Sequence, residues 1–400
     1  MKVKLTKLFI ACSMMIGLAA PMSVSAAAKT YTISPTSKPY KGKMTNFSTY
    51  NKYTRQYYVL RSYLEQFEKA GGGTLILKKG TYTIPKTLYV PSNVTIRLKS
   101  GAKILKGTKT GTKKIGPNKT LFQVVKPSIS LKSGVRGKYD GEKNITFIGE
   151  GTAIIDLNFE LDTIAIVAGH NRNIKIQNIH FQNLKQGHFV EMDATDTASI
   201  TENEFVNSKA SVNKNKEAIN LDTPDKVTKG WNHPWSKYDK TPNRNIKIVG
   251  NLFKNLDRAI GTHKYSEGKY HENILIQSNT IDTMREAPIR VMNWKNAVIE
   301  NNTIKNVVNG SGTFRGIFAS GAINPTFREN YFENVARPIG FMPWRNSDPG
   351  SVYKVTYNTI SPANIAALKT NRIKKTKENF IRINYIYNVF DRGTDKIYFQ

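Results

Sequence analysis

The sequence predicts an all-β solenoid, and three observations lead to this prediction: a repeated segment, its alternating hydrophobicity and its recurring asparagine. Six segments resemble one another from residue 173 onward, and NIKIVGNLFKN, NILIQSNTIDT and NAVIENNTIKN are examples. Apolar and polar residues alternate in each segment, as in a β-strand, and most repeats are about two dozen residues long. Each repeat is therefore expected to form one coil, whose strands pair with those of the neighbouring coils.

The recurring asparagines are expected to form a ladder at one bend of the coils. An Asn side chain at the same bend of each coil can hydrogen-bond to its counterpart in the next coil. The predicted members are Asn178, Asn203, Asn251, Asn279, Asn302 and Asn330, and Asn358 and Asn388 are expected to continue the series. The alternating Ile, Phe and Leu residues would then stack inside the coils as one continuous core.

The first 26 residues have the pattern of a secretory signal peptide. Three lysines precede an apolar run and a stretch of small residues, so cleavage is expected after Ala26. The apolar run is too short to span a bilayer comfortably, which argues against a membrane anchor. Cys12, the only cysteine, lies within this segment, so no disulfides are expected in the mature chain. We therefore expect a secreted bacterial protein, extracellular or associated with the cell wall.

Residues 27–70 are expected to form an N-terminal segment that ends in a capping helix. Tyr58, Leu60, Leu64 and Phe67 would share one face of this helix, and Gly71 would end it. Such a helix covers the unpaired sheet edge of the first coil. Residues 71–400 are then expected to form the solenoid, with an insertion loop at 223–243 and a C-terminal cap.

The stretch GGGTLILKKGTYTIPKTLYVPSNVTIRLKSGAKIL consists of short strands interrupted by Gly and Pro. It resembles the opening coils of right-handed parallel β-helices of the pectin-lyase-like superfamily. The resemblance covers roughly residues 70–390. It implies a right-handed parallel β-helix with an N-terminal capping helix.

A second strand follows each repeated segment, and these strands bring polar residues into register. The strands are FVEMDA, AINLDT, AIGTHK and PIRVMN. Their alignment predicts two outward columns on strands about 4.8 Å apart. One column holds Glu191, Asn220, Gly261 and Arg290, and the other holds Asp193, Asp222, His263 and Met292. Between the two columns, Val190, Ile219, Ile260 and Ile289 are expected to point inward.

These columns suggest a catalytic site for the hydrolysis of a polysaccharide. The predicted catalytic residues are Asp222, Asp193, Glu191 and His263. The diagonal pair Glu191 and Asp222 would be about 8 Å apart, within the range of inverting glycosidases. One carboxyl would protonate the leaving oxygen and the other would activate water. The first prediction is therefore a secreted glycoside hydrolase that needs no cofactor.

Further residues are predicted to bind the substrate. Arg290 could hold a sugar carboxylate in its planar fork, and loop aromatics could stack on sugar faces. The predicted substrate-binding residues are Arg290, Asn220, Glu217, Trp231, Trp235 and Tyr238.

Part of this constellation resembles the site of polygalacturonases. Asn220-Leu221-Asp222 is similar to their Asn-x-Asp motif, Gly261-Thr262-His263 to Gly-His-Gly, and Ile289-Arg290-Val291 to Arg-Ile-Lys. The Asp pair of that family is missing between the first two motifs. The resemblance therefore implies where the site lies rather than the activity itself.

Two other functions remain open at this point. In a pectate-type lyase, which the resemblance also allows, Glu191, Asp193 and Asp222 would bind Ca²⁺ through oxygen, and Arg290 would act as the base. The third reading is a non-catalytic cell-wall or glycan-binding protein.

The partner is expected to be a polyanion under all three readings. The net charge is +31, and +28 without the three signal-peptide lysines, which attracts uronic-acid polysaccharides or wall polyanions. No nucleic-acid motif is present, so nucleic acid is not an expected partner. No membrane association is expected after signal cleavage.

Overall fold

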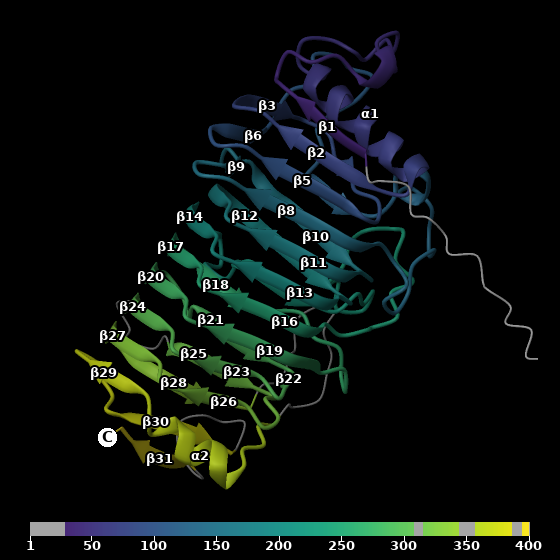
Figure 1. Ribbon diagram of the computed structural model, residues 1–400. Coiled ribbons are helices and arrows are strands. Elements are labelled where there is room, and N and C mark those ends of the chain that lie inside the picture. The colour runs from purple at the N-terminus through teal and green to yellow at the C-terminus, as the bar shows by residue number, and fades with distance from the viewer. Residues whose placement is uncertain (1–28, 308–314, 344–356, 386–393, 400) are drawn as a thin grey trace, which may run out of the picture.

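The computed structural model describes residues 29–307, 315–343, 357–385 and 394–399, and the predicted signal peptide and Asn388 lie outside these ranges. The described chain winds into coils whose strands stack in two long sheets (Figure 1). Among the described strands, pairs run parallel apart from the antiparallel pair of β30 and β31. These features confirm the predicted parallel β-helix.

The first sheet has 11 strands and the second has 20. The first contains β1 (Lys29–Ile33), β2 (Gly73–Leu77), β5 (Val94–Leu98), β8 (Lys143–Gly149), β11 (Arg172–Gln177), β13 (Asp196–Thr201), β16 (Arg244–Val249), β19 (His271–Gln277), β22 (Trp294–Lys295), β23 (Val298–Glu300) and β26 (Thr326–Arg328). The second contains β3 (Gly80–Ile84), β4 (Leu88–Tyr89), β6 (Ala102–Lys106), β7 (Thr120–Val124), β9 (Ile154–Asp156), β10 (Leu161–Gly169), β12 (His180–Asp193), β14 (Glu204–Lys209), β15 (Glu217–Asp222), β17 (Leu252–Leu256), β18 (Arg258–Gly261), β20 (Thr280–Met284), β21 (Ile289–Met292), β24 (Thr303–Val307), β25 (Arg315–Ser320), β27 (Tyr331–Val335), β28 (Arg337–Phe341), β29 (Arg372–Lys374), β30 (Phe380–Asn384) and β31 (Thr394–Tyr398).

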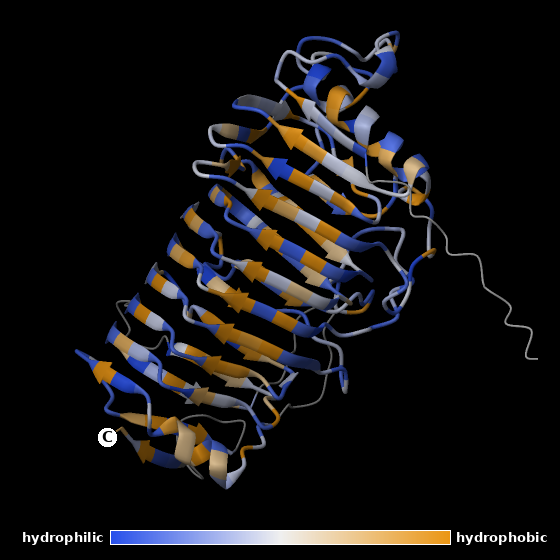
Figure 2. Cartoon of the chain, in the orientation of Figure 1, coloured by the Kyte–Doolittle hydropathy of each residue, from blue (hydrophilic) through white to orange (hydrophobic). Residues whose placement is uncertain are grey.

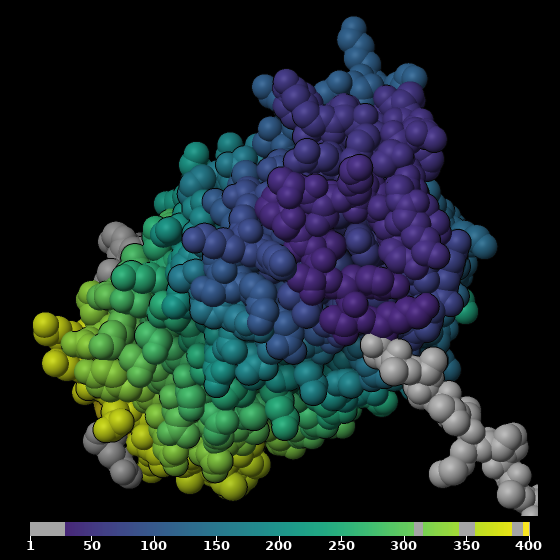
Figure 3. All heavy atoms as spheres, turned by 45° about the horizontal axis from the view of Figure 1, so that its top comes forward, coloured from purple at the N-terminus to yellow at the C-terminus, as the bar shows by residue number. Residues whose placement is uncertain are grey.

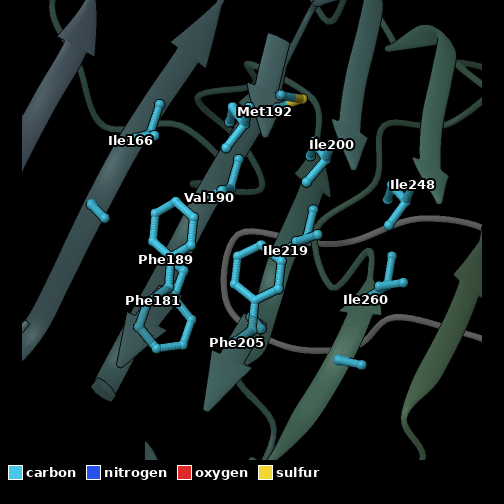
Figure 4. Packing of buried hydrophobic residues seen from close by; sticks show 14 of the residues in the cluster. Ile166, Phe181, Phe189, Val190, Met192, Ile200, Phe205, Ile219, Ile248 and Ile260 are labelled. Atoms are coloured by element: carbon cyan, nitrogen blue, oxygen red, sulfur yellow. The ribbon is translucent and has the colours of Figure 1, made fainter. Parts of the chain in front are cut away.

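The core is a set of side-chain stacks that run along the axis of the coils. In one stack, Ile200 pairs with Ile176 on one side and with Ile248 on the other, and all three are fully buried. In another, the ring of Phe205 stacks on that of Phe181 at 4.9 Å. Figure 4 shows Ile200, Ile248, Phe181 and Phe205 pointing into the same interior, and Figure 2 shows the alternation along the strands. Each fully buried Ile or Phe contributes about 1.5–3 kcal/mol, so adjacent coils stabilise one another.

The asparagine ladder forms, with two changes from the prediction. The side chains of Asn203, Asn251, Asn279, Asn302, Asn330 and Asn371 are buried and linked in that order by hydrogen bonds from N–H and Nδ2 to the next Oδ1. Asn178 is not a member, because Ile179 occupies the ladder position and donates its N–H to Asn203. Asn371 continues the ladder, whereas Asn358 accepts a hydrogen bond from the Ala322 N–H elsewhere.

Helix α1 (Arg55–Ala70) caps the N-terminal end of the solenoid, as predicted. Its buried face includes Tyr58, Leu60, Leu64 and Phe67. Gly71 ends the helix with a φ of 79°, a left-handed conformation that glycine adopts at little cost. Strand β1 was not predicted: it lies before the helix and pairs with β2, so the first sheet begins within residues 27–70.

Short helical elements complete the fold. Two 3-10 turns, η1 (Tyr40–Gly42) and η2 (Pro127–Ile129), lie in the N-terminal third. Near the other end lies α2 (Pro362–Leu368), which packs against β26 and is preceded by the cap residue Ser361, whose hydroxyl accepts the Asn364 N–H. No described helix has both the length and the apolar character needed to cross a bilayer.

Candidate functional site

The second strands of four coils lie side by side in the predicted register. Glu191 on β12 pairs with Asn220 on β15, Asn220 pairs with Gly261 on β18, and Gly261 pairs with Arg290 on β21. The column of Val190, Ile219, Ile260 and Ile289 is fully buried in the core. Thus the structure brings together the polar residues that the repeat alignment placed in one column.

The second predicted column is interrupted where the chain leaves the sheet. Asp193 pairs with Asp222, but β18 ends at Gly261, so His263 lies beyond the strand. The His263 backbone N–H nevertheless donates to Asp222 Oδ1 at 3.0 Å, which keeps the imidazole beside this column. Met292 is buried and offers no polar group.

The side-chain oxygens of Asp193 and Asp222 accept hydrogen bonds from backbone N–H groups. Asp193 Oδ1 accepts the Asp222 N–H at 3.1 Å, and Asp222 Oδ1 accepts the N–H groups of His263 and Lys264, each at 3.0 Å. Both side chains are 0% exposed. The expectation that they face a substrate groove is therefore wrong, because each is enclosed and satisfies donors at the point where a strand ends.

Burial changes the ionisation of this carboxyl cluster. Burial and the nearby Asp222 raise the pKa of Glu191 to about 8, and burial and Glu191 raise the pKa of Asp193 well above its usual value. Burial also raises the pKa of Asp222, against the opposing charge of His263. With a pKa of about 8, Glu191 holds its proton at neutral pH, since a buried carboxyl is more stable neutral than charged.

Glu217 forms a second cluster with His263 and Asn220. Glu217 Oε2 lies 3.1 Å from His263 Nδ1, and Asn220 Oδ1 lies 3.1 Å from the same nitrogen. Glu217 is fully buried, which opposes ionisation, but the charge of His263 outweighs burial and lowers the pKa of Glu217 well below its usual value. Glu217 thus remains the charged carboxylate of the region.

Two residues of this cluster were missed by the sequence analysis. His188 is buried, and its Nδ1 lies 2.6 Å from the Glu217 carbonyl oxygen. Arg258 on β18 is in register with Glu217 and is 7% exposed. A register signal was present in the sequence, because both residues lie three positions before the Glu191 column, as Glu217 does. His188, Glu217 and His263 each offer a potential metal ligand, and the three ligand atoms lie within 4.8 Å of one another.

Arg290 lies at the end of the Glu191 column and is partly exposed. Burial of its guanidinium and the nearby charge of Arg258 lower the pKa of Arg290 to about 10. It therefore remains cationic at neutral pH.

The aromatic residues of the insertion loop anchor the loop. Trp231 and Trp235 are 3% and 0% exposed and pack with Val125 and Val167. Gly169 makes room for them, since a Cβ there would lie 2.3 Å from the Trp231 ring. The prediction that these tryptophans present free faces to a sugar is therefore wrong.

Tyr238 belongs to the same loop and is half-buried. Its hydroxyl donates to the His233 carbonyl oxygen at 3.1 Å, and the Lys226 ammonium lies over its ring at 5.0 Å. Trp294 is also fully buried and donates from Nε1 to Thr262 Oγ1.

No family model matches the chain. A curated relative, plasmin and fibronectin-binding protein A of Streptococcus pneumoniae (strain ATCC BAA-255 / R6), is 23% identical over 264 residues. The aligned part is 60% of this chain and 35% of the relative, so the chain spans about a third of the relative's length.

Solved structures show the same fold. Two structures of PfbA, described as a Streptococcus pneumoniae surface adhesin, each cover 82% of this chain at 16% and 18% identity, with TM-scores of 0.54 and 0.56. They cover 79% and 84% of the adhesin chains. A polygalacturonase from Erwinia carotovora ssp. carotovora covers 72% of this chain and 74% of its own, at 13% identity and a TM-score of 0.45, which is too distant a likeness to support its activity.

These comparisons overturn the predicted enzyme. The curated relative and the two structures above are described by what they bind or as an adhesin, and not by a reaction. The burial of Asp193, Asp222 and Glu217 agrees with this correction. The chain is a parallel β-helix protein that is similar to a pneumococcal surface adhesin.

Proposed function

We propose that this protein is an extracellular, non-catalytic binding protein that attaches to an anionic wall polymer or glycan through its N-terminal end. The observation that carries the proposal is the distribution of charge. Residues 29–143 contain 24 Lys and Arg but only four Asp and Glu. Residues 144–400 contain 33 Lys and Arg and 25 Asp and Glu. The positive charge is therefore concentrated at the N-terminal end of the solenoid.

Exposed lysines gather on this end, which we call the basic end. Its members are Lys38, Lys41, Lys43, Lys52, Lys109, Lys113 and Lys114. The two segments that carry them touch, since Asn51 Nδ2 donates to the Thr110 carbonyl oxygen at 2.9 Å. Figure 3 looks onto this end, where the purple N-terminal residues cover the solenoid.

The basic end has few acidic groups to neutralise it. Of the four carboxylates in residues 29–143, Glu65 pairs with Arg61 and Glu142 pairs with Arg136. Lys41 and Lys43 flank the ring of Tyr40 at 5.7 and 5.6 Å. A surface with excess positive charge attracts a polymer of repeating phosphates or carboxylates, and the attraction weakens as salt screens it.

Binding of a host protein is the second candidate function. The observation that favours it is the similarity to the pneumococcal relative, whose name states that it binds plasmin and fibronectin. That similarity includes only about a third of the relative, so the binding region of the relative is not thereby assigned to this chain.

A binding assay tests the two candidates together. The mature chain would be titrated with purified teichoic acid, a uronic-acid polysaccharide, plasmin and fibronectin at low and physiological salt. The fourfold variant Lys38→Glu, Lys41→Glu, Lys43→Glu, Lys52→Glu should weaken polyanion binding by about tenfold or more. The matched control is Lys175→Glu, Lys247→Glu, Lys254→Glu, Lys369→Glu, which changes the same net charge at exposed positions outside the basic end.

The two variants separate the outcomes. Equal losses in both would show that only the total charge matters and would reject the basic end as the binding surface. Binding of plasmin or fibronectin without any polyanion binding would favour the second candidate.

A further inference from the structure

Two imidazoles and one carboxylate from three successive coils converge in the region of Glu217. His188 is on β12, Glu217 begins β15, and His263 follows β18, and these three strands are neighbours. We propose that His188, Glu217 and His263 bind one divalent transition-metal ion of the Zn²⁺ class, which ties the three coils together. The ligand set decides the class, because imidazole suits Zn²⁺ and its neighbours whereas Ca²⁺ and Mg²⁺ prefer oxygen ligands alone.

The hydrogen bond of His188 presents a free lone pair for the metal. Its Nδ1 lies 2.6 Å from the Glu217 carbonyl oxygen, which can only accept, so Nδ1 carries the proton. In the neutral ring, Nε2 is then unprotonated and available as a ligand. A backbone carbonyl that fixes the tautomer in this way is the usual outer partner of a metal-binding histidine.

The spacing of the other two ligands suits a tetrahedral ion. His263 Nδ1 and Glu217 Oε2 are 3.1 Å apart, and a bound ion would displace the proton that Nδ1 shares with this acceptor. Ligands that lie about 2.0–2.1 Å from Zn²⁺ at tetrahedral angles are about 3.3 Å from each other. The three ligand atoms fall within 4.8 Å of one another, so shifts of about 1 Å close the set around an ion.

Buried oxygens beside the imidazole need a positive partner. Glu217 is 0% exposed, and its Oε1 accepts no hydrogen bond from the described residues. Oε2 lies 3.1 Å from the His263 ring nitrogen. Asp222 Oδ2 is likewise buried without a hydrogen-bond donor and lies 3.6 Å from His263 Nδ1. A bound cation would satisfy these oxygens, which cost free energy when left alone in a buried site.

Two arginines oppose a cation at this site: Arg258, which is in register with Glu217, and Arg290, whose charge interacts with that of Glu217. Arg258 repels a cation at this site. Its Nη2 lies 3.2 Å from Glu286 Oε2, however, and this carboxylate offsets part of the arginine charge. The alternative is an ion pair between Glu217 and a protonated His263 with no metal. The two arrangements predict different metal-binding behaviour.

Metal titration of the untagged, EDTA-treated mature chain tests the proposal. We expect one equivalent of Zn²⁺ to bind and to raise the melting temperature, and Mg²⁺ at the same concentration to have no effect. Co²⁺ should give the visible absorption of a tetrahedral site. Glu217→Gln and His188→Gln should each weaken Zn²⁺ binding by about tenfold or more.

His180→Gln is the matched control, because His180 is a surface histidine that also pairs with a glutamate, Glu204, at 2.6 Å. Its Zn²⁺ binding should equal that of the wild type. Circular dichroism checks the fold of each variant, and if His188→Gln does not fold, the isosteric Glu217→Gln carries the test. The proposal is overturned if the wild-type chain binds no Zn²⁺, or if Glu217→Gln binds Zn²⁺ as tightly as the wild type.

Discussion

Asp193 and Asp222 lie opposite each other on adjacent strands, and Asp193 Oδ1 accepts the Asp222 backbone N–H at 3.1 Å. Two carboxyls that look like a catalytic pair in the sequence therefore belong to the hydrogen bonding of successive coils. This relationship explains why their burial is compatible with a stable fold. It also makes their contribution measurable as stability.

Replacement of Asp193 should show how much its hydrogen bond to the neighbouring coil contributes to stability. Asp193→Ala removes the acceptor for the Asp222 N–H and should lower the free energy of unfolding by about 1–3 kcal/mol. Asp193→Asn keeps an acceptor oxygen, so it should cost less than Asp193→Ala. Urea unfolding near neutral pH measures both variants, and equal losses would refute the structural role of this oxygen.

Glu191 should make the stability depend on pH. Its folded pKa of about 8 exceeds the unfolded value near 4.5, so the folded state binds the extra proton between these values. Because the folded state binds more protons there, the stabilisation is complete below about pH 4.5 and is lost as the pH rises through 8. Glu191→Gln has no ionisable group at this position. Between about pH 5 and pH 8.5, its free energy of unfolding should therefore rise by about 1–4 kcal/mol relative to that of the wild type.

Urea unfolding of Glu191→Gln and the wild type at both pH values checks this expectation. A constant difference between the two proteins would mean that the proton on Glu191 is not retained in the folded state. Asp282→Asn, at a half-buried carboxylate on β20 outside the cluster, is the control.

The buried ladder should be sensitive to the loss of one member. Asn279 accepts from the N–H and Nδ2 of Asn251 and donates to the Ile248 carbonyl and to Asn302. Asn279→Ala leaves several buried partners unsatisfied and should cost about 2–4 kcal/mol. The control Lys247→Ala, on the exposed face of β16, should change stability by less than about 0.5 kcal/mol in the same denaturation series.

Trp235 should matter for stability rather than for glycan binding. The side chain is fully buried and its Nε1 donates to Gln123 Oε1 at 3.1 Å. Trp235→Ala should therefore lower the free energy of unfolding by about 3–5 kcal/mol. Tyr357→Ala, at a residue that is 57% exposed, should have little effect.

Fluorescence adds a second readout of the same residue. The tryptophan emission of the wild type should not shift on addition of polysaccharide, because the ring has no exposed face to stack on a sugar. A marked shift of the emission in the wild type that is absent in Trp235→Ala would show that this residue takes part directly in binding.

The repeat determined the fold from the sequence alone. The spacing of Ile, Phe and Asn is a local property, and a coil that buries this face against its neighbours has one register that keeps all apolar residues inside. That is why the pairing of Glu191 with Asn220 and of Gly261 with Arg290 followed from alignment. Asn178 is the exception. Phe181 pairs with Phe205 on the next coil, and this pairing places Ile179, rather than Asn178, at the ladder position next to Asn203.

Tertiary structure alone decided what faces solvent. The burial of Trp231 and Trp235 depends on Val125 and Val167, which lie far away in the sequence and on other coils. The ionisation of Glu191 and Glu217 likewise depends on the distances to Asp222 and His263 in three dimensions. The hydrophobic pattern of a strand depends only on residues that are near one another in the sequence. The burial and ionisation of a side chain depend on all the residues around it, and many of these are distant in the sequence. The sequence therefore determined which side chains would share a face, and only the folded chain decided that most of the predicted catalytic groups are enclosed.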